Sequence, residues 1–206
     1  MSAEAGIEQV SRSVRVVVDR TLGGVFASPA VVSPNGDGRA DVLEFGYTLT
    51  RTATVRVQVR RGGDVLRTLL SHAQAAGSHV LDWNGRVQGG RLADGSAHVV
   101  VRATTSLGTR KLARPAELDT RSPAVRVLSL RTVKGAMQLR LRLTEPAELQ
   151  VWHGHETWRD GGSFVVTRPA GEVWIRRPFR AKVVRIVATD GGLNRSDPVI
   201  YRVRRR

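Results

Sequence analysis

The sequence predicts an all-β chain that folds as two layered sandwiches joined by a short linker. One observation is that apolar residues recur at every second position in many short segments, which places them on one face of a strand. Another is that turn signals such as Asn84-Gly85 and Asp94-Gly95 separate these segments at short intervals. Many short strands joined by tight turns are typical of a sandwich or a barrel.

Strands are expected along almost the whole chain. In the first half they are expected near residues 14–18, 42–49, 53–60, 65–70, 79–83 and 97–104. In the second half they are expected near residues 125–130, 137–143, 147–153, 163–167, 172–176, 182–189 and 199–203. Only Ser71–Ala76 (SHAQAA) has a helical composition, and that segment is too short to form a helix alone.

The net charge of +15 is the most pronounced compositional feature, and arginine supplies almost all of it. Such a surface could bind polyanions such as nucleic acid, teichoic acid or lipopolysaccharide. In Thr54–Arg60 (TVRVQVR) and Met137–Leu143 (MQLRLRL), however, the arginines alternate with apolar residues. The alternation indicates that they form the solvent-facing side of half-buried strands. Only the C-terminal arginines form a dense cluster, and as candidate binding residues we name Arg202, Arg204, Arg205 and Arg206.

A change in composition divides the chain into two parts. Ala113–Pro123 (ARPAELDTRSP) contains two prolines and no periodicity, and it follows a complete set of strands. A weak internal repeat supports this division, since Val18–Thr21 (VDRT) resembles Leu118–Arg121 (LDTR). We therefore expect a linker or a strand of a preceding module at residues 1–24, a first domain at 25–112, a linker at 113–122 and a second domain at 123–206.

Six segments follow one another in a characteristic order within residues 26–107. They are Ser33–Asp41 (SPNGDGRAD), Ala53–Val59 (ATVRVQV), Val65–Leu69 (VLRTL), Ala76–His79 (AGSH), Trp83–Arg86 (WNGR) and Asp94–Gly95. In their order and spacing they resemble the immunoglobulin-like domain of the flagellar hook-capping protein family, which is repeated in many secreted bacterial proteins. Trp83 is expected to fill the core, beside a turn at Asn84-Gly85. The family usually has an aromatic residue where this chain has Ala97.

Residues 120–204 resemble generic bacterial immunoglobulin-like domains, through Asp119-Thr120, Pro123 and Ala188-Thr189-Asp190. Together the two resemblances imply two tandem immunoglobulin-like β-sandwiches. The function that they imply is scaffolding, which means rigid spacing, attachment to the cell surface, or assembly of an extracellular structure.

One loop of the first domain has the residue spacing of a calcium-binding loop. Ser33–Glu44 (SPNGDGRADVLE) places Gly38 at the position of the sharp bend and oxygen-bearing side chains around it. Ser33 stands where such loops have an aspartate, and the alternative is a turn whose side chains cap backbone amides. As candidate calcium ligands the sequence offers Asn35, Asp37, Asp41 and Glu44.

Three tryptophans, Trp152, Trp158 and Trp174, lie in the second domain. Aromatic side chains on a sandwich face could form a platform on which sugars stack, although at least one of the three is expected to fill the core. His153 and His155 alternate along a strand and could share a zinc ion, but Gly154 between them favours an ordinary hairpin tip.

The sequence carries no catalytic motif. It has no cysteine, no nucleophile elbow, no glycine-rich phosphate loop and no histidine in a recognised catalytic spacing. No apolar run approaches the length that crosses a bilayer. The N-terminus lacks the basic start and apolar stretch of a signal peptide. We therefore expect a non-enzymatic spacer, attachment or assembly module, and we expect this chain to be a fragment of a bacterial secreted or cell-surface protein.

Two alternative functions remain open at this point. The chain could be a polyanion- or glycan-binding module of the cell wall, or it could take part in flagellar hook assembly. The expected partners are cell-wall polymers or another anionic surface, and the adjacent domains of a longer chain. Nucleic acid is not expected as a partner, and no cofactor is expected other than calcium at the Ser33–Glu44 loop.

Overall fold

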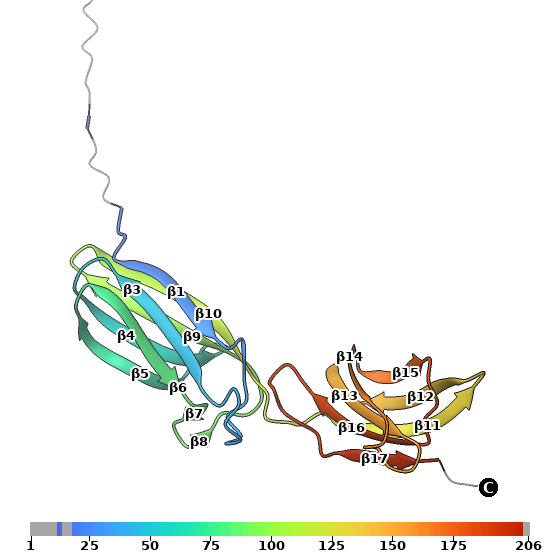
Figure 1. Cartoon of the computed structure of the whole chain (residues 1–206). Coiled ribbons are helices and arrows are strands. Elements are labelled where there is room, and N and C mark those ends of the chain that lie inside the picture. The colour runs from blue at the N-terminus through green and yellow to red at the C-terminus, as the bar shows by residue number, and fades with distance from the viewer. Residues whose placement is uncertain (1–11, 14–17, 204–206) are drawn as a thin grey trace, which may run out of the picture.

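The computed structural model describes residues 12–13 and 18–203, and all regular structure in these ranges is β-strand (Figure 1). No helix that could span a membrane is found among the described residues. Two sandwiches follow one another along the chain, with a short connection between them. The strand expected near residues 14–18 falls mostly outside the described residues.

The first sandwich packs a three-stranded sheet against a five-stranded sheet. The three-stranded sheet has the order β1 (Leu22–Ser28), β3 (Leu43–Leu49) and β6 (Gly77–Trp83). The five-stranded sheet has the order β2 (Val31–Val32), β10 (Gly108–Leu118), β9 (Gly95–Thr105), β4 (Ala53–Arg61) and β5 (Asp64–Gln74). A small hairpin of β7 (Arg86–Val87) and β8 (Gly90–Arg91) follows β6.

Alternating side chains of the two sheets form the first core. Val55, Val57 and Val59 of β4 are fully buried, and they belong to one cluster with Phe45 and Trp83. Trp83 is 2% exposed, and its indole N–H donates to the Arg86 carbonyl at 2.8 Å. The predicted core position of Trp83 is therefore confirmed.

The second sandwich has a three-stranded and a four-stranded sheet. The first has the order β11 (Val125–Val133), β12 (Ala136–Leu143) and β15 (Gly171–Arg177). The second has the order β14 (Ser163–Arg168), β13 (Ala147–Gly154), β16 (Val183–Thr189) and β17 (Val199–Arg202). Apart from the short β2 and the β7–β8 hairpin, corresponding strands pair in the same order in both sandwiches. This shared topology is that of immunoglobulin- and fibronectin type III-like domains, so the predicted fold class is confirmed.

The second core is mainly aliphatic, and the expectation that a tryptophan fills it is wrong. Leu139, Leu149 and Ile186 are fully buried, whereas Trp174 is 56% exposed. The reason is the phase of the alternation. Trp174 follows Val173 and precedes Ile175 on β15, and both of these neighbours point inward. Trp152 is likewise out of phase with its buried neighbour Val151, and Trp158 lies in the loop after β13.

The domain boundaries differ from the expected ones at both ends of the first sandwich. Residues 113–118, expected as linker, belong to β10, and the connection is only residues 119–124. Pro115 is tolerated in this strand because β2 borders β10 only at Glu117 and Leu118, so one side of β10 has no ladder partner at Pro115. At the other end, β1 already begins at Leu22. Ser71–Ala76 forms no helix despite its helical composition, because its first four residues belong to β5.

Candidate functional site at the domain junction

Asn194 is the centre of the junction between the two sandwiches. It lies in the loop between β16 and β17, and it is fully buried. Its Oδ1 accepts hydrogen bonds from the Ser33 hydroxyl and, at 2.9 Å, from the Asn35 side-chain amide, both of which belong to the first sandwich. Its Nδ2 donates to the carbonyl oxygen of Asp119 in the connection, at 2.9 Å. One side chain therefore joins both domains and the segment between them.

The loop that carries Asn194 is held in shape by Asp190. Oδ1 of this buried carboxylate accepts from the backbone amides of Gly192 and Asn194 at 2.8 and 3.0 Å. Its Oδ2 accepts from the Asn194 side chain at 3.0 Å. The loop approaches the first sandwich so closely at Gly192 that an added Cβ would lie 3.2 Å from a Val31 methyl group.

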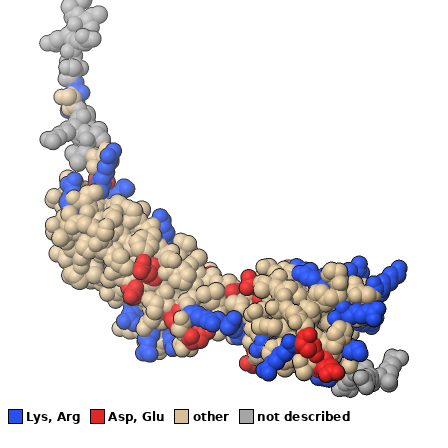
Figure 2. Space-filling view, viewed as in Figure 1, with Lys and Arg blue, Asp and Glu red and all other residues tan. Residues whose placement is uncertain are grey.

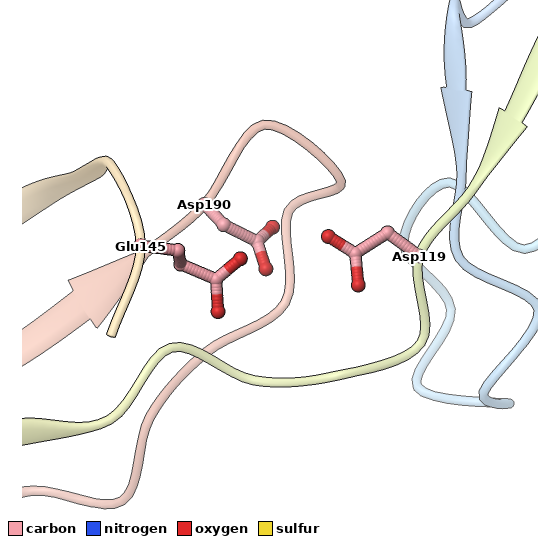
Figure 3. Close-up of side chains that lie close together, drawn as sticks. All are labelled: Asp119, Glu145 and Asp190. Carbon is pink, nitrogen blue, oxygen red and sulfur yellow. The ribbon is translucent and has the colours of Figure 1, made fainter. Parts of the chain in front are cut away.

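Three carboxylates converge beside this loop. Asp119 comes from the connection, Glu145 from the turn between β12 and β13, and Asp190 from the β16–β17 loop. Figure 3 shows their side chains pointing toward one another, and one oxygen of each lies within 4.8 Å of the others. They line an open cleft of 730 Å³ whose walls come from both sandwiches, including Val31, Leu118, Thr144 and Pro146. We call Asp119, Glu145 and Asp190 the junction carboxylates.

Partial burial and mutual repulsion raise the pKa of two junction carboxylates. Burial is the main cause of the raised pKa of Asp119, and the charges of Asp190 and Asp94 add to it. The pKa of Glu145 is raised by burial and then by Asp119 and Asp190. Arg121 opposes both shifts, and its guanidinium lies 3.3 Å from Asp94. Protonation or a hard divalent cation could relieve this concentration of charge. Proximity of carboxylates alone does not assign a metal.

Sequence reasoning missed the junction carboxylates as a group. Asp119 and Asp190 both lie in segments that the internal repeat and the resemblance to bacterial domains single out. That is the one available signal, because no pattern marks Glu145. The group exists only because three loops of the folded chain end at the same place.

Three of the four calcium-ligand candidates of the first sandwich accept hydrogen bonds from backbone amides of their own loop. The Asp41 carboxylate accepts from the backbone amides of Gly36 and Gly38, both at 2.7 Å. Asn35 and Asp37 each accept from the backbone amide two residues further on, at 2.9 Å. Glu44 lies on β3, opposite Asp82 of β6. In the part of the chain that the structure describes, the carboxylates of Asp37, Asp41 and Glu44 do not form a group within 4.8 Å. Calcium at this loop stays a prediction.

The structure places two of the three tryptophans together and the third on the other sheet. Trp152 and Trp158 lie edge to face with ring centroids 6.1 Å apart, and the guanidinium of Arg185 lies 4.5 and 5.0 Å from the two rings. Trp174 belongs to the other sheet of the same sandwich. Arg202 of β17 donates to the Glu156 carbonyl at 2.5 Å. Arg204, Arg205 and Arg206 lie outside the described residues.

His153 packs in the second sandwich. Its ring stacks on Phe179 with centroids 3.8 Å apart, and burial lowers its pKa, with a smaller effect from His155. His155 is exposed, and its backbone amide donates to Asp160 at 2.8 Å. Zinc binding by this pair stays a prediction, and the geometry of His153 is that of a packing residue.

Comparison with known proteins finds similarity of fold only. No family model matches the chain, and no curated protein does. Fibronectin(III)-like modules of CbhA from Clostridium thermocellum align with a TM-score of 0.42 at 12% identity, over 87% of this chain and 93% of that one. The strand order of the chain itself shows two tandem β-sandwiches with an immunoglobulin-like fold.

Two further solved structures are similar at comparable levels. The BSP domain of a biofilm-associated protein aligns with a TM-score of 0.33 at 15% identity, over 89% of this chain and 29% of that one. The calcium-binding domain CBD12 of CALX1.1 aligns with a TM-score of 0.32 at 11% identity, over 80% and 78% of the two chains. Identities and TM-scores this low leave the function to be argued from the site, and the resemblance to the hook-capping family stays a prediction.

Proposed function

We propose that this chain is a non-catalytic spacer and attachment module of a bacterial secreted or cell-surface protein. The observation that best supports the proposal is the hydrogen bonding of the buried Asn194 to both sandwiches and to the connection. Modules joined by a mobile linker move relative to one another by default. A spacer that has to hold its ends in a fixed orientation needs a junction that opposes this motion.

Hydrogen bonds also attach both ends of the connection to the sandwiches. The backbone amide and hydroxyl of Thr120 donate to Asp94 of the first sandwich at 3.0 and 2.9 Å. The Ala124 amide donates to the Thr144 hydroxyl of the second sandwich at 2.9 Å. Only a few residues lie between these anchors, so little of the connection is left to act as a hinge.

An altered packing of the two sandwiches that kept Ser33 and Asn194 buried would leave polar groups without partners. The Ser33 hydroxyl and the Asn194 side chain are both fully buried, and a buried polar group without a partner costs about 1–3 kcal/mol. The junction polar groups therefore favour one arrangement of the two sandwiches over others. The extracellular location is inferred from the resemblance of residues 26–107 to a domain of secreted bacterial proteins.

The test is the distribution of distances between the two sandwiches. Because the chain has no cysteine, spin labels can be attached to cysteines introduced at the exposed positions Ser71 and Thr167. Pulsed electron paramagnetic resonance should give one narrow distance distribution for the otherwise unaltered chain. Asn194→Ala should broaden it, while Gln150→Ala on the outer face of β13 should not.

Thermal unfolding shows whether each variant is folded. If Asn194→Ala does not fold, Ser33→Ala removes one of the two hydrogen bonds that the first sandwich donates to Asn194 and should still broaden the distribution. A broad distribution in the chain with an intact junction would contradict the rigid spacer.

A further inference from the structure

We propose that the outer face of the β11–β12–β15 sheet binds an anionic polysaccharide. This inference goes beyond the spacer function and does not depend on it. The face consists of three rows of residues that lie opposite one another across the three strands. The rows are Arg126, Arg142 and Glu172; Ser129, Arg140 and Trp174; and Arg131, Gln138 and Arg176. We call these nine residues the arginine face.

The buried partners of these residues fix their direction. On β12, Met137, Leu139 and Leu141 are fully buried, so the residues between them point to the opposite side of the sheet. The same holds on β15, where Val173 and Ile175 flank Trp174. Alternation along each strand was visible in the sequence. The alignment of the three strands into rows comes from their register.

The arginine face carries an excess of positive charge. Its single acid, Glu172, lies between two arginines, with the Arg142 guanidinium at 2.6 Å and that of Arg140 also in contact. The ion pairs of this face that involve described residues all use Glu172. Arg126, Arg131 and Arg176 are exposed, and their guanidinium groups are free to meet an external anion.

The spacing of the sheet distributes these cations in two directions. Neighbouring strands lie about 5 Å apart, and residues of one face recur about every 7 Å along a strand. Guanidinium groups bind carboxylate, sulfate and phosphate oxygens through two parallel hydrogen bonds. A linear polymer with an anionic group on each repeat could therefore meet several arginines at once.

Trp174 indicates that the polymer is built of sugars. Its ring is 56% exposed in the middle row, and the Arg140 guanidinium lies 5.6 Å from its centroid. An exposed indole offers a broad apolar surface on which the C–H face of a sugar ring can stack. Arginines above and below that ring hold the charged substituents of the neighbouring sugars.

Other polyanions fit the arginine face less well. Proteins that hold single-stranded nucleic acid stack successive bases on several aromatic side chains, and this face has one. The major groove of duplex DNA admits a helix or a two-stranded ribbon, and a three-stranded sheet face is too broad to enter it. The other tryptophans of this sandwich, Trp152 and Trp158, are less exposed than Trp174 and lie outside the arginine face.

Figure 2 agrees with this placement. Lys and Arg side chains gather along the upper and right-hand edges of the second sandwich, near the strands that Figure 1 labels β12 and β15, and acidic side chains lie below them. Much of the surface of the first sandwich in the same view lacks charged side chains.

The test compares two pairs of arginines. Arg126→Gln with Arg142→Gln removes two arginines that lie opposite each other on the arginine face. The matched control is Arg56→Gln with Arg102→Gln, which removes an opposed and exposed pair from the first sandwich and lowers the net charge equally. Trp174→Ala tests stacking. Binding is measured by isothermal titration calorimetry with heparin, polygalacturonate, uncharged dextran and a single-stranded oligonucleotide, at low and at physiological salt.

We expect binding to heparin or polygalacturonate but not to dextran, and the preferred polymer distinguishes sulfate from carboxylate recognition. Trp174→Ala should weaken the binding roughly tenfold, the scale of one lost stacking contact. The Arg126–Arg142 variant should weaken it and make it less dependent on salt, and the Arg56–Arg102 variant should retain most of it.

Three results would overturn the proposal. One is the absence of binding to either charged polysaccharide at low salt. Another is equal weakening by both arginine pairs, which would mean attraction by net charge alone. The third is tighter binding of the oligonucleotide than of the polysaccharides. A thermal midpoint for each variant ensures that lost binding is not lost folding.

Discussion

Replacing Glu145 by glutamine removes one charge from the junction carboxylates, and we expect the second sandwich to become more stable at neutral pH. Glutamine keeps the shape of the side chain and its ability to form hydrogen bonds. What changes is the repulsion between Glu145 and two other carboxylates whose oxygens lie within 4.8 Å. The variant therefore isolates the electrostatic penalty of the junction.

The size of the effect follows from this separation. Two unit charges 4.8 Å apart repel each other by about 1 kcal/mol in surroundings with the dielectric constant of water. Glu145 has two such neighbours, but salt and partial exposure reduce both interactions. We expect a gain of roughly 1 kcal/mol in the free energy of unfolding, which shifts the thermal midpoint of a domain this size by roughly 4–8 °C.

The pH dependence gives a second readout. The pKa values of Asp119 and Glu145 are raised in the folded protein, so the folded state binds these protons more tightly than the unfolded chain. The penalty is present at neutral pH, is relieved as the pH falls through the raised pKa values of the folded state, and is gone below the ordinary carboxyl pKa, about pH 4. The difference between Glu145→Gln and the unaltered protein should therefore be largest at pH 7 and vanish on acidification.

Thermal unfolding followed by circular dichroism, in the presence of a chelator, is the assay. The chelator is needed because a bound divalent cation would neutralise the same charges. Glu148→Gln is the matched control, since its partners across the sheet are Thr167 and Thr189, and it should change the stability little. If Glu145→Gln proved less stable than the unaltered protein at pH 7, or if its gain persisted at low pH, the electrostatic account would be wrong.

Two further predictions concern the hairpin between β13 and β14. Gly154→Ala should destabilise the second sandwich by about 1–3 kcal/mol in urea, because the added Cβ would lie 1.9 Å from the Thr157 carbonyl oxygen. Gly191→Ala, where no atom lies within 4 Å of the added Cβ, should be nearly neutral, and equal losses would contradict the steric reason. His153→Phe should remove part of the stability loss between pH 7 and pH 5. The pKa of His153 is lowered in the folded state, so the unfolded chain takes up the proton more readily as the pH falls through about 6.5. Identical pH dependence of the thermal midpoint in both proteins would refute this role.

The sequence predicted strands well where burial alternates cleanly. On β4 the valines and on β12 Met137 and the leucines are buried, while the residues between them, apart from Gln58, are partly or fully exposed, because a sheet with one wet face imposes a period of two. Strand β1 (LGGVFAS) was not expected, since its two glycines interrupt that pattern. No strand was expected where β10 lies, and its end was assigned to the linker because Pro115 is ordinarily a sign of one. Only the pairing of β10 shows that Pro115 lies on an unpaired side of the strand.

The candidate sites could be predicted only in part, because they depend on distances that a sequence does not contain. The alternation showed that Arg140 and Arg142 face solvent, but not that Arg126, Trp174 and Arg176 lie beside them. Asn194 could not have been found by residue type, because its role comes from burial between two domains.

The direction of the terminal strands determines how the molecule would respond to a pulling force. In the first sandwich β1 and β10 both run toward the junction, and in the second β11 and β17 both run away from it (Figure 1). Tension applied at Leu22 and Arg202 would therefore act along the strands of each sandwich. The ladder hydrogen bonds lie across that direction and would bear the load together, instead of opening one after another from an end. Such a geometry resists extension, which suits a module placed between an anchor and the object that it holds.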